Sequence, residues 1–143
     1  MNISHTKLAA VLPPDFKRLL HINCGEGEIV RRLAERHDAF FTGVTEIREH
    51  LSAARRKNIA KAEFFLEGHR SLFFHDNTFD VIVSSETVDD FREIHRVLVP
   101  SGRFIMPYGG EYYPEIASMR MKLCGFEKIS DHGDVLIAHK GSL

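Results

Sequence analysis

Two glycines, Gly25 and Gly27, stand where a short apolar run ends and an amphipathic stretch begins. Glycine at such a turn lets the backbone approach a ligand closely. The unpaired N–H groups and the positive dipole of a following helix then favour an anionic group such as a carboxylate. The same residues also suit a tight strand-to-helix turn that binds nothing, because two glycines alone are a weak motif.

Glu46 follows Gly25 by 21 residues and lies at the end of the second predicted strand. At this spacing an acidic side chain can accept hydrogen bonds from both hydroxyls of a ribose. Each shielded, charge-assisted bond of this kind contributes about 1.5–3 kcal/mol. The alternative is a carboxylate that pairs with the N-terminal dipole of the helix beginning at Arg48.

Val30 stands three positions after the second glycine, where a dinucleotide-binding loop needs a third small residue. This difference weakens a pyrophosphate-binding interpretation and disfavours a nicotinamide-dependent oxidoreductase. A loop that presents one helix N-terminus instead suits a smaller zwitterion that carries an amino acid and an adenosine.

Apolar runs and helical stripes alternate along the chain and predict the elements that position these residues. Predicted strands cover residues 18–23, 39–44, 62–66, 79–84, 103–106, 126–130 and 135–139. Predicted helices cover residues 29–36, 48–58, 89–98 and 114–123, and Pro100 and Gly102 follow the third of them. Parallel strands need long, right-handed crossovers, so the alternation predicts an α/β fold. We expect a three-layer fold in which a doubly wound, mostly parallel sheet lies between two layers of helices. The last two strands of this sheet form a hairpin.

The chain has 143 residues, with 19 Lys and Arg against 20 Asp and Glu. This length predicts one domain, residues 1–143, with an N-terminal extension over 1–14 and a core over 15–143. The charge balance argues against a nucleic-acid or membrane partner, and no apolar run approaches the ~20 residues that cross a bilayer. Cys24 and Cys124 lack disulfide or metal spacing, so we expect a reducing compartment and a cytoplasmic protein.

Four segments resemble motifs of the class I S-adenosylmethionine-dependent methyltransferases, especially of their small-molecule branch. They are residues 20–27, 43–46, 72–82 and 93–103, and the resemblance spans nearly the whole chain. It implies a seven-stranded sheet whose final hairpin strand runs antiparallel. It also implies that S-adenosylmethionine is held over the first, second and fourth strands.

The resemblance further implies a set of cofactor-binding residues at the carboxyl ends of the strands. They are Asn23, Gly25, Gly27, Glu46, Ile47, Gly68, His69 and Ser84. The acid that contacts adenine in the family falls near Gly68, which leaves Glu67 or His69 for contact with the base.

Three residues differ from the pattern of the family. His21 stands in place of an aspartate, Asn23 in place of the first glycine, and Thr45 in place of the ribose-binding acid, which is displaced to Glu46. These differences motivate a second hypothesis, a catalytically inactive methyltransferase-like module that binds a protein partner.

Methyl transfer from a sulfonium needs alignment of donor and acceptor more than a strong catalytic group, so no catalytic residue is required. If an acceptor must lose a proton, the candidates are Glu86, Asp89, Asp90 and, less directly, His95. For the three carboxylates we favour helix capping and solvated charge, and for His95 a surface or half-buried position on a helix.

Three tyrosines follow the fifth predicted strand, and they are candidates for the wall of an acceptor pocket. They are Tyr108, Tyr112 and Tyr113. Met119 and Met121 are expected to alternate between the surface and the core of the next helix. The nine histidines show no zinc-ligand spacing, so we expect no metal site.

The leading hypothesis is an enzyme that transfers a methyl group from S-adenosylmethionine to a small-molecule acceptor. The segments that give such enzymes their specificity are minimal in this chain. Residues 1–11 are expected to form one short helix over the cofactor. A site so lightly covered predicts completion by a second subunit in a homodimer.

Overall fold

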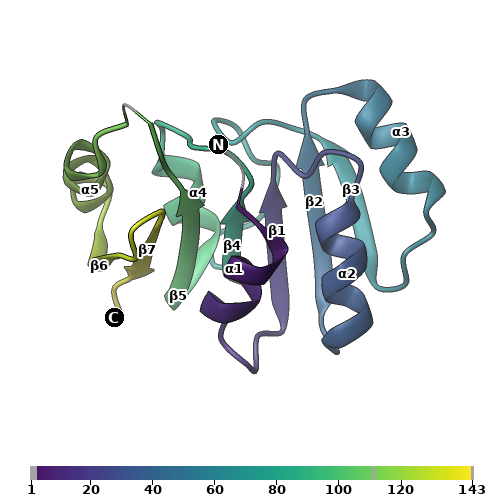
Figure 1. Cartoon of the computed structure of the whole chain (residues 1–143), viewed down its shortest axis with the longest axis horizontal. Helices are drawn as coiled ribbons and strands as arrows, with labels where there is room; N and C mark the ends of the chain where they lie inside the picture. The colour runs from purple at the N-terminus through teal and green to yellow at the C-terminus, as the bar shows by residue number, and fades with distance from the viewer. Residues whose placement is uncertain (1–2, 111, 143) are drawn as a thin grey trace.

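Seven strands form a single sheet in a computed structural model that describes residues 3–110 and 112–142 (Figure 1). They are β1 (Arg18–Ile22), β2 (Phe40–Thr45), β3 (Ala62–Leu66), β4 (Phe79–Ser84), β5 (Leu98–Pro107), β6 (Phe126–Asp131) and β7 (Val135–Lys140). The strand order is β3-β2-β1-β4-β5-β7-β6. Only the pairings of β7 with β5 and with β6 are antiparallel. The predicted seven-stranded, mostly parallel sheet with an antiparallel C-terminal hairpin strand is therefore confirmed.

Helices cover both faces of the sheet and make the two outer layers (Figure 1). In the described ranges they are α1 (His5–Val11), α2 (Glu28–Arg36), α3 (Arg48–Arg56), α4 (Arg92–Val97) and α5 (Pro114–Leu123). The first three share one face, and α4 and α5 lie on the other. In this part of the chain no helix combines the length and the apolar character that crossing a membrane requires.

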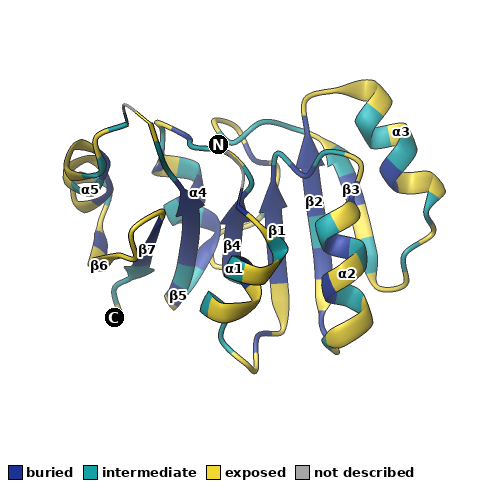
Figure 2. Ribbon diagram, viewed as in Figure 1, coloured by how far each residue is buried: buried dark blue, intermediate teal, exposed yellow. Residues whose placement is uncertain are grey.

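The central strands are buried on both faces, as Figure 2 shows. Leu19 on β1 contributes to the core beneath α1, α2 and α3, whereas Leu20 contributes to the core beneath α4 and α5. Neighbouring side chains on a strand point to opposite faces, so an unbroken apolar run suits a strand covered on both sides. This explains why the short apolar run before Asn23 folds as β1.

The predicted short helix within residues 1–11 is present as α1, although Met1 and Asn2 lie outside the described residues. The Ser4 side chain accepts a hydrogen bond from the N–H of Lys7 and so begins the helix. Leu8 is fully buried, in one core with Val81 and Ile105 of the sheet. The helix therefore covers a sheet face rather than the strand ends, which corrects its expected place over a cofactor.

The predicted helix over residues 89–98 is shorter than expected, because α4 covers Arg92–Val97 and β5 already begins at Leu98. Leu98 pairs with Phe79, and the next paired residue is Arg103, opposite Val81. Residues 99–102 thus form a bulge inside β5. Ser101 in this bulge has φ 66°, so the Pro100 and Gly102 signals marked a strand irregularity rather than a loop between two elements.

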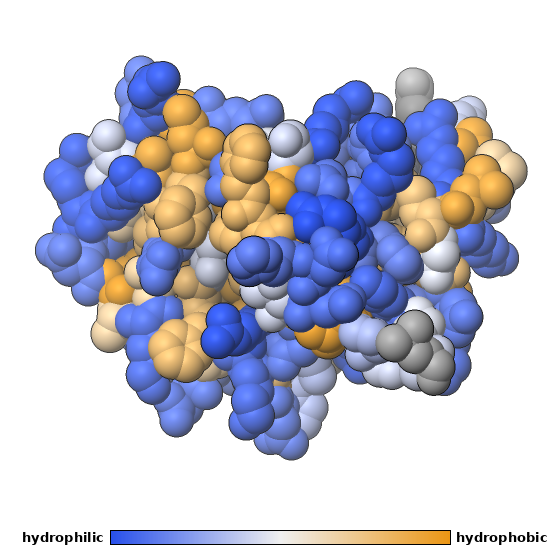
Figure 3. All heavy atoms as spheres, turned by 180° about the vertical axis from the view of Figure 1, so that it is seen from behind, coloured by the Kyte–Doolittle hydropathy of each residue, from blue (hydrophilic) through white to orange (hydrophobic). Residues whose placement is uncertain are grey.

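Residues 67–78 connect β3 to β4 without forming a helix. The sheet face beside this segment is only partly covered, and apolar side chains gather there at the surface when the molecule is seen from behind (Figure 3). An irregular segment needs partners for its backbone groups, because few of them can bond to one another. Here α4 supplies these partners.

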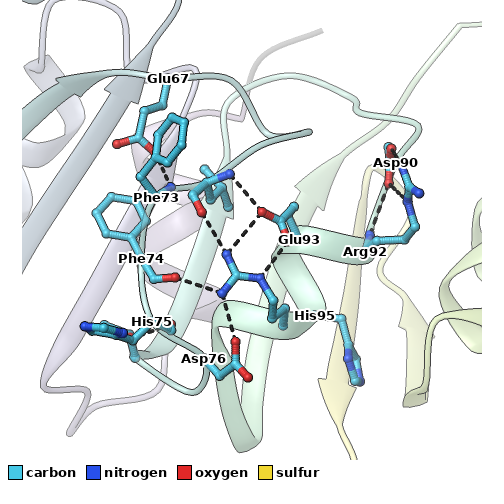
Figure 4. A network of polar contacts seen from close by, with 12 residues as sticks. Glu67, Phe73, Phe74, His75, Asp76, Asp90, Arg92, Glu93 and His95 are labelled. Carbon is cyan, nitrogen blue, oxygen red and sulfur yellow. Dashed lines mark hydrogen bonds and ion pairs between the residues drawn. The ribbon is translucent and has the colours of Figure 1, made fainter.

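Arg96 of α4 is the centre of the network that holds this segment, and Figure 4 labels its partners Phe74, Asp76 and Glu93. Its guanidinium donates hydrogen bonds to the carbonyls of Leu72 (2.7 Å) and Phe74 (2.8 Å) and to Asp76 Oδ1 (2.8 Å). Glu93 accepts a bond from Arg96 Nε at 2.6 Å and another from the N–H of Leu72 at 3.0 Å. The bond from Arg96 holds the pKa of Glu93 below its usual value. One arginine thereby fixes the path of the chain between β3 and β4.

Replacing Arg96 by methionine should lower the free energy of unfolding by about 2–3 kcal/mol, because partly buried carbonyls lose charged donors. Urea unfolding measures this loss. The matched control is Arg92→Met on the same helix, because the Arg92 guanidinium is 77% exposed and its ion pair with Asp90 should contribute less than the bonds of Arg96. Equal losses in the two variants would contradict the role assigned to Arg96.

Candidate functional site

The carboxyl ends of the central parallel strands meet at one edge of the sheet, where four loops leave them (Figure 1). Backbone hydrogen bonds continue the pairing past the strand ends. The N–H of Cys24 donates to the Val44 carbonyl (3.0 Å), and the N–H of Glu67 donates to the Thr45 carbonyl (3.0 Å). The N–H of Ser85 likewise donates to the Ile22 carbonyl (3.1 Å). The loops that carry the predicted cofactor-binding residues are thus joined at their bases.

The loop between β1 and α2 is a sharp turn with three residues at positive φ. Asn23, Gly25 and Gly27 have φ values of 57°, 56° and 84°. Asparagine tolerates this conformation better than most residues, so Asn23 preserves the turn in place of a glycine. The N–H of Gly27 donates to the Cys24 carbonyl (3.1 Å), and α2 then starts at Glu28. The first-turn N–H groups of α2 lack intrahelical partners and can receive an anion.

Glu46 and Gly68 meet across the ends of β2 and β3. A Cβ added at Gly68 would collide with the Glu46 carboxylate, so only glycine leaves room for this contact. The hydroxyl of the buried Thr45 accepts a hydrogen bond from the N–H of Ile47 (3.2 Å), and Glu46 is exposed. No hydrogen bond or ion pair joins the Glu46 carboxylate to another described residue. Its two oxygens are therefore open to a pair of ligand hydroxyls.

His69 and Glu67 differ in how far their side chains are already engaged. Glu67 Oε1 accepts a hydrogen bond from the N–H of Phe73 (2.8 Å), so Glu67 serves the 67–78 segment. His69 Nε2 is buried without a hydrogen-bond partner among the described residues and lies 3.7 Å from Asp89 Oδ1. Ile47, 47% exposed, adds an apolar side chain at the same edge. Of the two residues considered for the base, His69 is the one whose side chain makes no hydrogen bond to another described residue.

Ser84 and Ser85 at the end of β4 have different partners. Ser84 is fully buried, its hydroxyl donates to the Glu86 carbonyl, and the N–H of Glu86 donates back at 3.3 Å. Ser85 is half-buried and its hydroxyl forms a hydrogen bond with His21 Nε2. From the sequence, His21 is only a departure from the family pattern, and no motif points to Ser85. The pairing of β1 with β4 brings the two together, since Ile22 lies opposite Ser84.

His21 is neutral at neutral pH. Burial lowers its pKa to about 4, because a charged imidazole would lose its hydration in the core. Its Nδ1 atom is buried without a hydrogen-bond partner among the described residues. A neutral group therefore occupies the position where the resemblance places an aspartate.

The four candidate proton acceptors lie in different surroundings. Asp90 binds the Arg92 guanidinium, which holds the pKa of Asp90 at about 2, and accepts the N–H of Arg92 at 3.2 Å. Asp89 Oδ1 accepts a bond from Arg70 Nη2 (2.8 Å). His95 packs edge-on against Phe126 and so lies away from the strand ends. Glu86 is exposed just after β4.

Two of the three tyrosines line a hollow beside this edge. The hollow has a volume of about 280 Å³, and its lining includes Tyr112, Tyr113 and Asp89. Tyr108 is turned elsewhere, since its hydroxyl donates to Asp131, and this bond raises the pKa of Tyr108 to about 12. On α5, Met119 is exposed and Met121 is buried, as predicted.

The thiols and the metal-ligating side chains form no further site. Cys24 and Cys124 are free, and burial raises the pKa of Cys24 to about 12. Over residues 3–110 and 112–142, no three His, Cys, Asp or Glu side chains lie close enough together to hold a metal ion.

Comparison with known proteins supports one family. Residues 19–102, more than half of the chain, match the model of a family described as "Methyltransferase domain". The search of curated proteins gives no match. The structural comparisons that follow have low sequence identity and so show the fold alone.

Three solved structures illustrate the shared fold. The [4+2]-cyclase SpnF is 21% identical with a TM-score of 0.80, over 97% of this chain and 80% of that chain. A TehB-like SAM-dependent methyltransferase from Corynebacterium glutamicum is 18% identical with a TM-score of 0.75, over 97% and 87%. A SAM-dependent methyltransferase from Aquifex aeolicus is 14% identical with a TM-score of 0.69, over 94% and 87%.

The burial of His21 predicts an acid-sensitive fold. The unfolded chain takes up a proton on His21 as the pH falls through about 6.5, whereas the folded chain does so only near pH 4. Stability is therefore lost as the pH falls, and His21 accounts for about 3 kcal/mol of the loss at pH 4. Urea unfolding at pH 7 and pH 4 should show a smaller loss for His21→Asn than for the wild type. The control is His75→Asn, which removes an exposed imidazole. Between pH 7 and pH 4 its free energy of unfolding should fall by as much as that of the wild type.

Proposed function

Because this chain belongs to the class I S-adenosylmethionine-dependent methyltransferase family, we propose that it transfers a methyl group from S-adenosylmethionine to a small-molecule acceptor. The observation that carries the proposal is the open Glu46 carboxylate, packed against Gly68 beside the glycine loop. The two free thiols, Cys24 and Cys124, support a cytoplasmic location.

The residues at the strand edge fit the parts of this cofactor. Glu46 would accept hydrogen bonds from the two ribose hydroxyls. The turn from Asn23 to Gly27 and the first turn of α2 would receive the carboxylate of the methionine portion. Ile47 and His69 lie on the side left for adenine, and His69 Nε2 offers the base an unused polar atom. When bound, the cofactor supplies a methyl group activated by a positively charged sulfur.

The protein's own contribution to the reaction is mainly to hold the two reactants in line. The hollow beside Tyr112 and Tyr113, about 280 Å³ in volume, would hold a small acceptor. Asp90 is a poor proton acceptor, because Arg92 keeps its carboxylate ionised and bound. The exposed Glu86 and solvent remain to take a proton from an acceptor that must lose one.

The fold by itself admits other chemistry, since one similar structure is a [4+2]-cyclase. The match to the methyltransferase family favours methyl transfer. An inactive module would leave the strand edge without a ligand. Cofactor binding therefore separates the proposed enzyme from this alternative.

S-Adenosylhomocysteine should raise the melting temperature of the protein, since a ligand of the native state at a hundredfold excess over its Kd adds about 2.7 kcal/mol. Incubation with methyl-labelled S-adenosylmethionine and a small-molecule extract should then place label in the small-molecule fraction. Label found only in precipitated protein would contradict a small-molecule acceptor. An unchanged melting temperature at millimolar ligand would favour the inactive module.

Glu46→Gln should raise the Kd for S-adenosylhomocysteine by about tenfold or more, because two ribose hydroxyls lose a charged acceptor. Isothermal titration calorimetry measures the change. Glu49→Gln, an exposed carboxylate on the first turn of α3, is the control and should bind as the wild type does. Equal affinities of Glu46→Gln and wild type would reject the ribose assignment while keeping the family.

Gly68→Ala should weaken binding of the same ligand several-fold without a large loss of stability, because the new Cβ displaces the Glu46 carboxylate. The two changes act on one contact, so Gly68→Ala should add little in the Glu46→Gln background. Independent, additive effects in this double-mutant cycle would show that Gly68 acts by another route.

A further inference from the structure

A groove of about 700 Å³ crosses the sheet face opposite α1, α2 and α3, on the side shown in Figure 3. It lies over β2 and β3 and is bordered by residues 67–78. Its lining includes five phenylalanines on this face: Phe40, Phe65, Phe73, Phe74 and Phe79. Contiguous apolar surface of this kind on a protein marks a place where another molecule binds.

Phe73 is the most exposed of these rings. Its exposed fraction is 80%, compared with 57% for Phe40. The N–H of Phe73 donates to Glu67, and Arg96 holds the carbonyls of both its neighbours, Leu72 and Phe74 (Figure 4). The backbone is thus fixed while the ring faces solvent. An aromatic side chain on a fixed backbone loses little conformational entropy on binding, so Phe73 is suited to be an anchor residue of an interface.

The groove has cations at the amino ends of its strands and carboxylates further along β3. Arg18 and Lys61 lie at the amino ends of β1 and β3, both within 6 Å of the Phe40 ring centre, at 5.8 and 5.7 Å. Glu63 is the second residue of β3, two positions after Lys61, and Glu67 directly follows the last residue of this strand. The lining therefore carries two cations and two anions, so a strongly charged partner would gain little from it.

We propose that this face binds a second copy of the chain. A two-fold axis that lies between the two facing sheets, parallel to them and perpendicular to the strands, reverses the strand direction. It lets the cations at the amino end of each groove face the carboxylates further along β3 of the other copy. Phe73 of each copy then enters the groove of its partner. Anchor and receiving groove lie on the same surface, as a two-fold interface requires. The second copy lies against the 67–78 segment, beside Gly68 and His69 rather than over the strand ends.

Sedimentation velocity, from micromolar to submillimolar protein and without cofactor, should show a monomer–dimer equilibrium. Phe73→Asp should raise the dimer Kd by about thirtyfold or more. Leu123→Asp is the matched control, since Leu123 is 81% exposed on α5 outside the groove, and it should dimerise as the wild type does. Thermal unfolding verifies that each variant is folded, which is expected because both side chains face solvent.

The charge arrangement has its own test. Arg18→Glu and Glu63→Lys should each self-associate more weakly than the wild type, and an equimolar mixture of the two should recover dimer, because only unlike copies then attract. A wild-type monomer throughout the range, a dimer indifferent to Phe73→Asp, or a mixture without recovery would overturn the proposal. None of these results depends on cofactor binding, so the proposed function stands or fails separately.

Discussion

β1 pairs with β2 on one side and with β4 on the other, and its residues from Leu19 to Ile22 are buried. All three strands run in the same direction, so their carboxyl ends leave the sheet together. The loops that follow these strands therefore lie at one edge of the sheet. Backbone hydrogen bonds from the N–H groups of Cys24 and Ser85 hold the bases of these loops together. The glycine turn, the Glu46 carboxylate and the His21–Ser85 pair all take their positions from this central pairing.

The parts of the fold that could be predicted from the sequence are those that leave a periodic apolar pattern. β1 and β4 are unbroken apolar runs, and α2 shows one buried stripe through Val30 and Leu33. The boundary between α4 and β5 could not be predicted in this way. Proline and glycine, here Pro100 and Gly102, are typical both of a loop and of a bulge within a strand. The path of residues 67–78 could not be predicted either. It depends on hydrogen bonds from Arg96 to backbone carbonyls, and because every residue type has a carbonyl, such bonds leave no sequence pattern.

The candidate site shows the same division. The spacing from Gly25 to Glu46 pointed to a ribose-binding carboxylate, but the contact of Glu46 with Gly68 depends on the pairing of β2 with β3. Two of the three departures from the family pattern have side chains that suit the local backbone. Asn23 adopts a left-handed conformation, which asparagine tolerates better than most residues. The Thr45 hydroxyl accepts the N–H of Ile47, and the neighbouring Glu46 carries the charge. His21 is different, because it exchanges a carboxylate for a neutral, buried ring.

The reversed direction of β7 also decides on which side of the molecule the described chain finishes. Val135 lies opposite Pro107 at the end of β5, and His139 lies opposite Arg103 further toward its start, so β7 ends toward the amino edge of the sheet. The glycine turn and Glu46 are at the other edge, as Figure 1 shows for the two ends of the strands. A polypeptide joined beyond Ser142 therefore leaves the molecule away from the open strand ends, and an affinity label or a surface tether attached there keeps clear of the ligand.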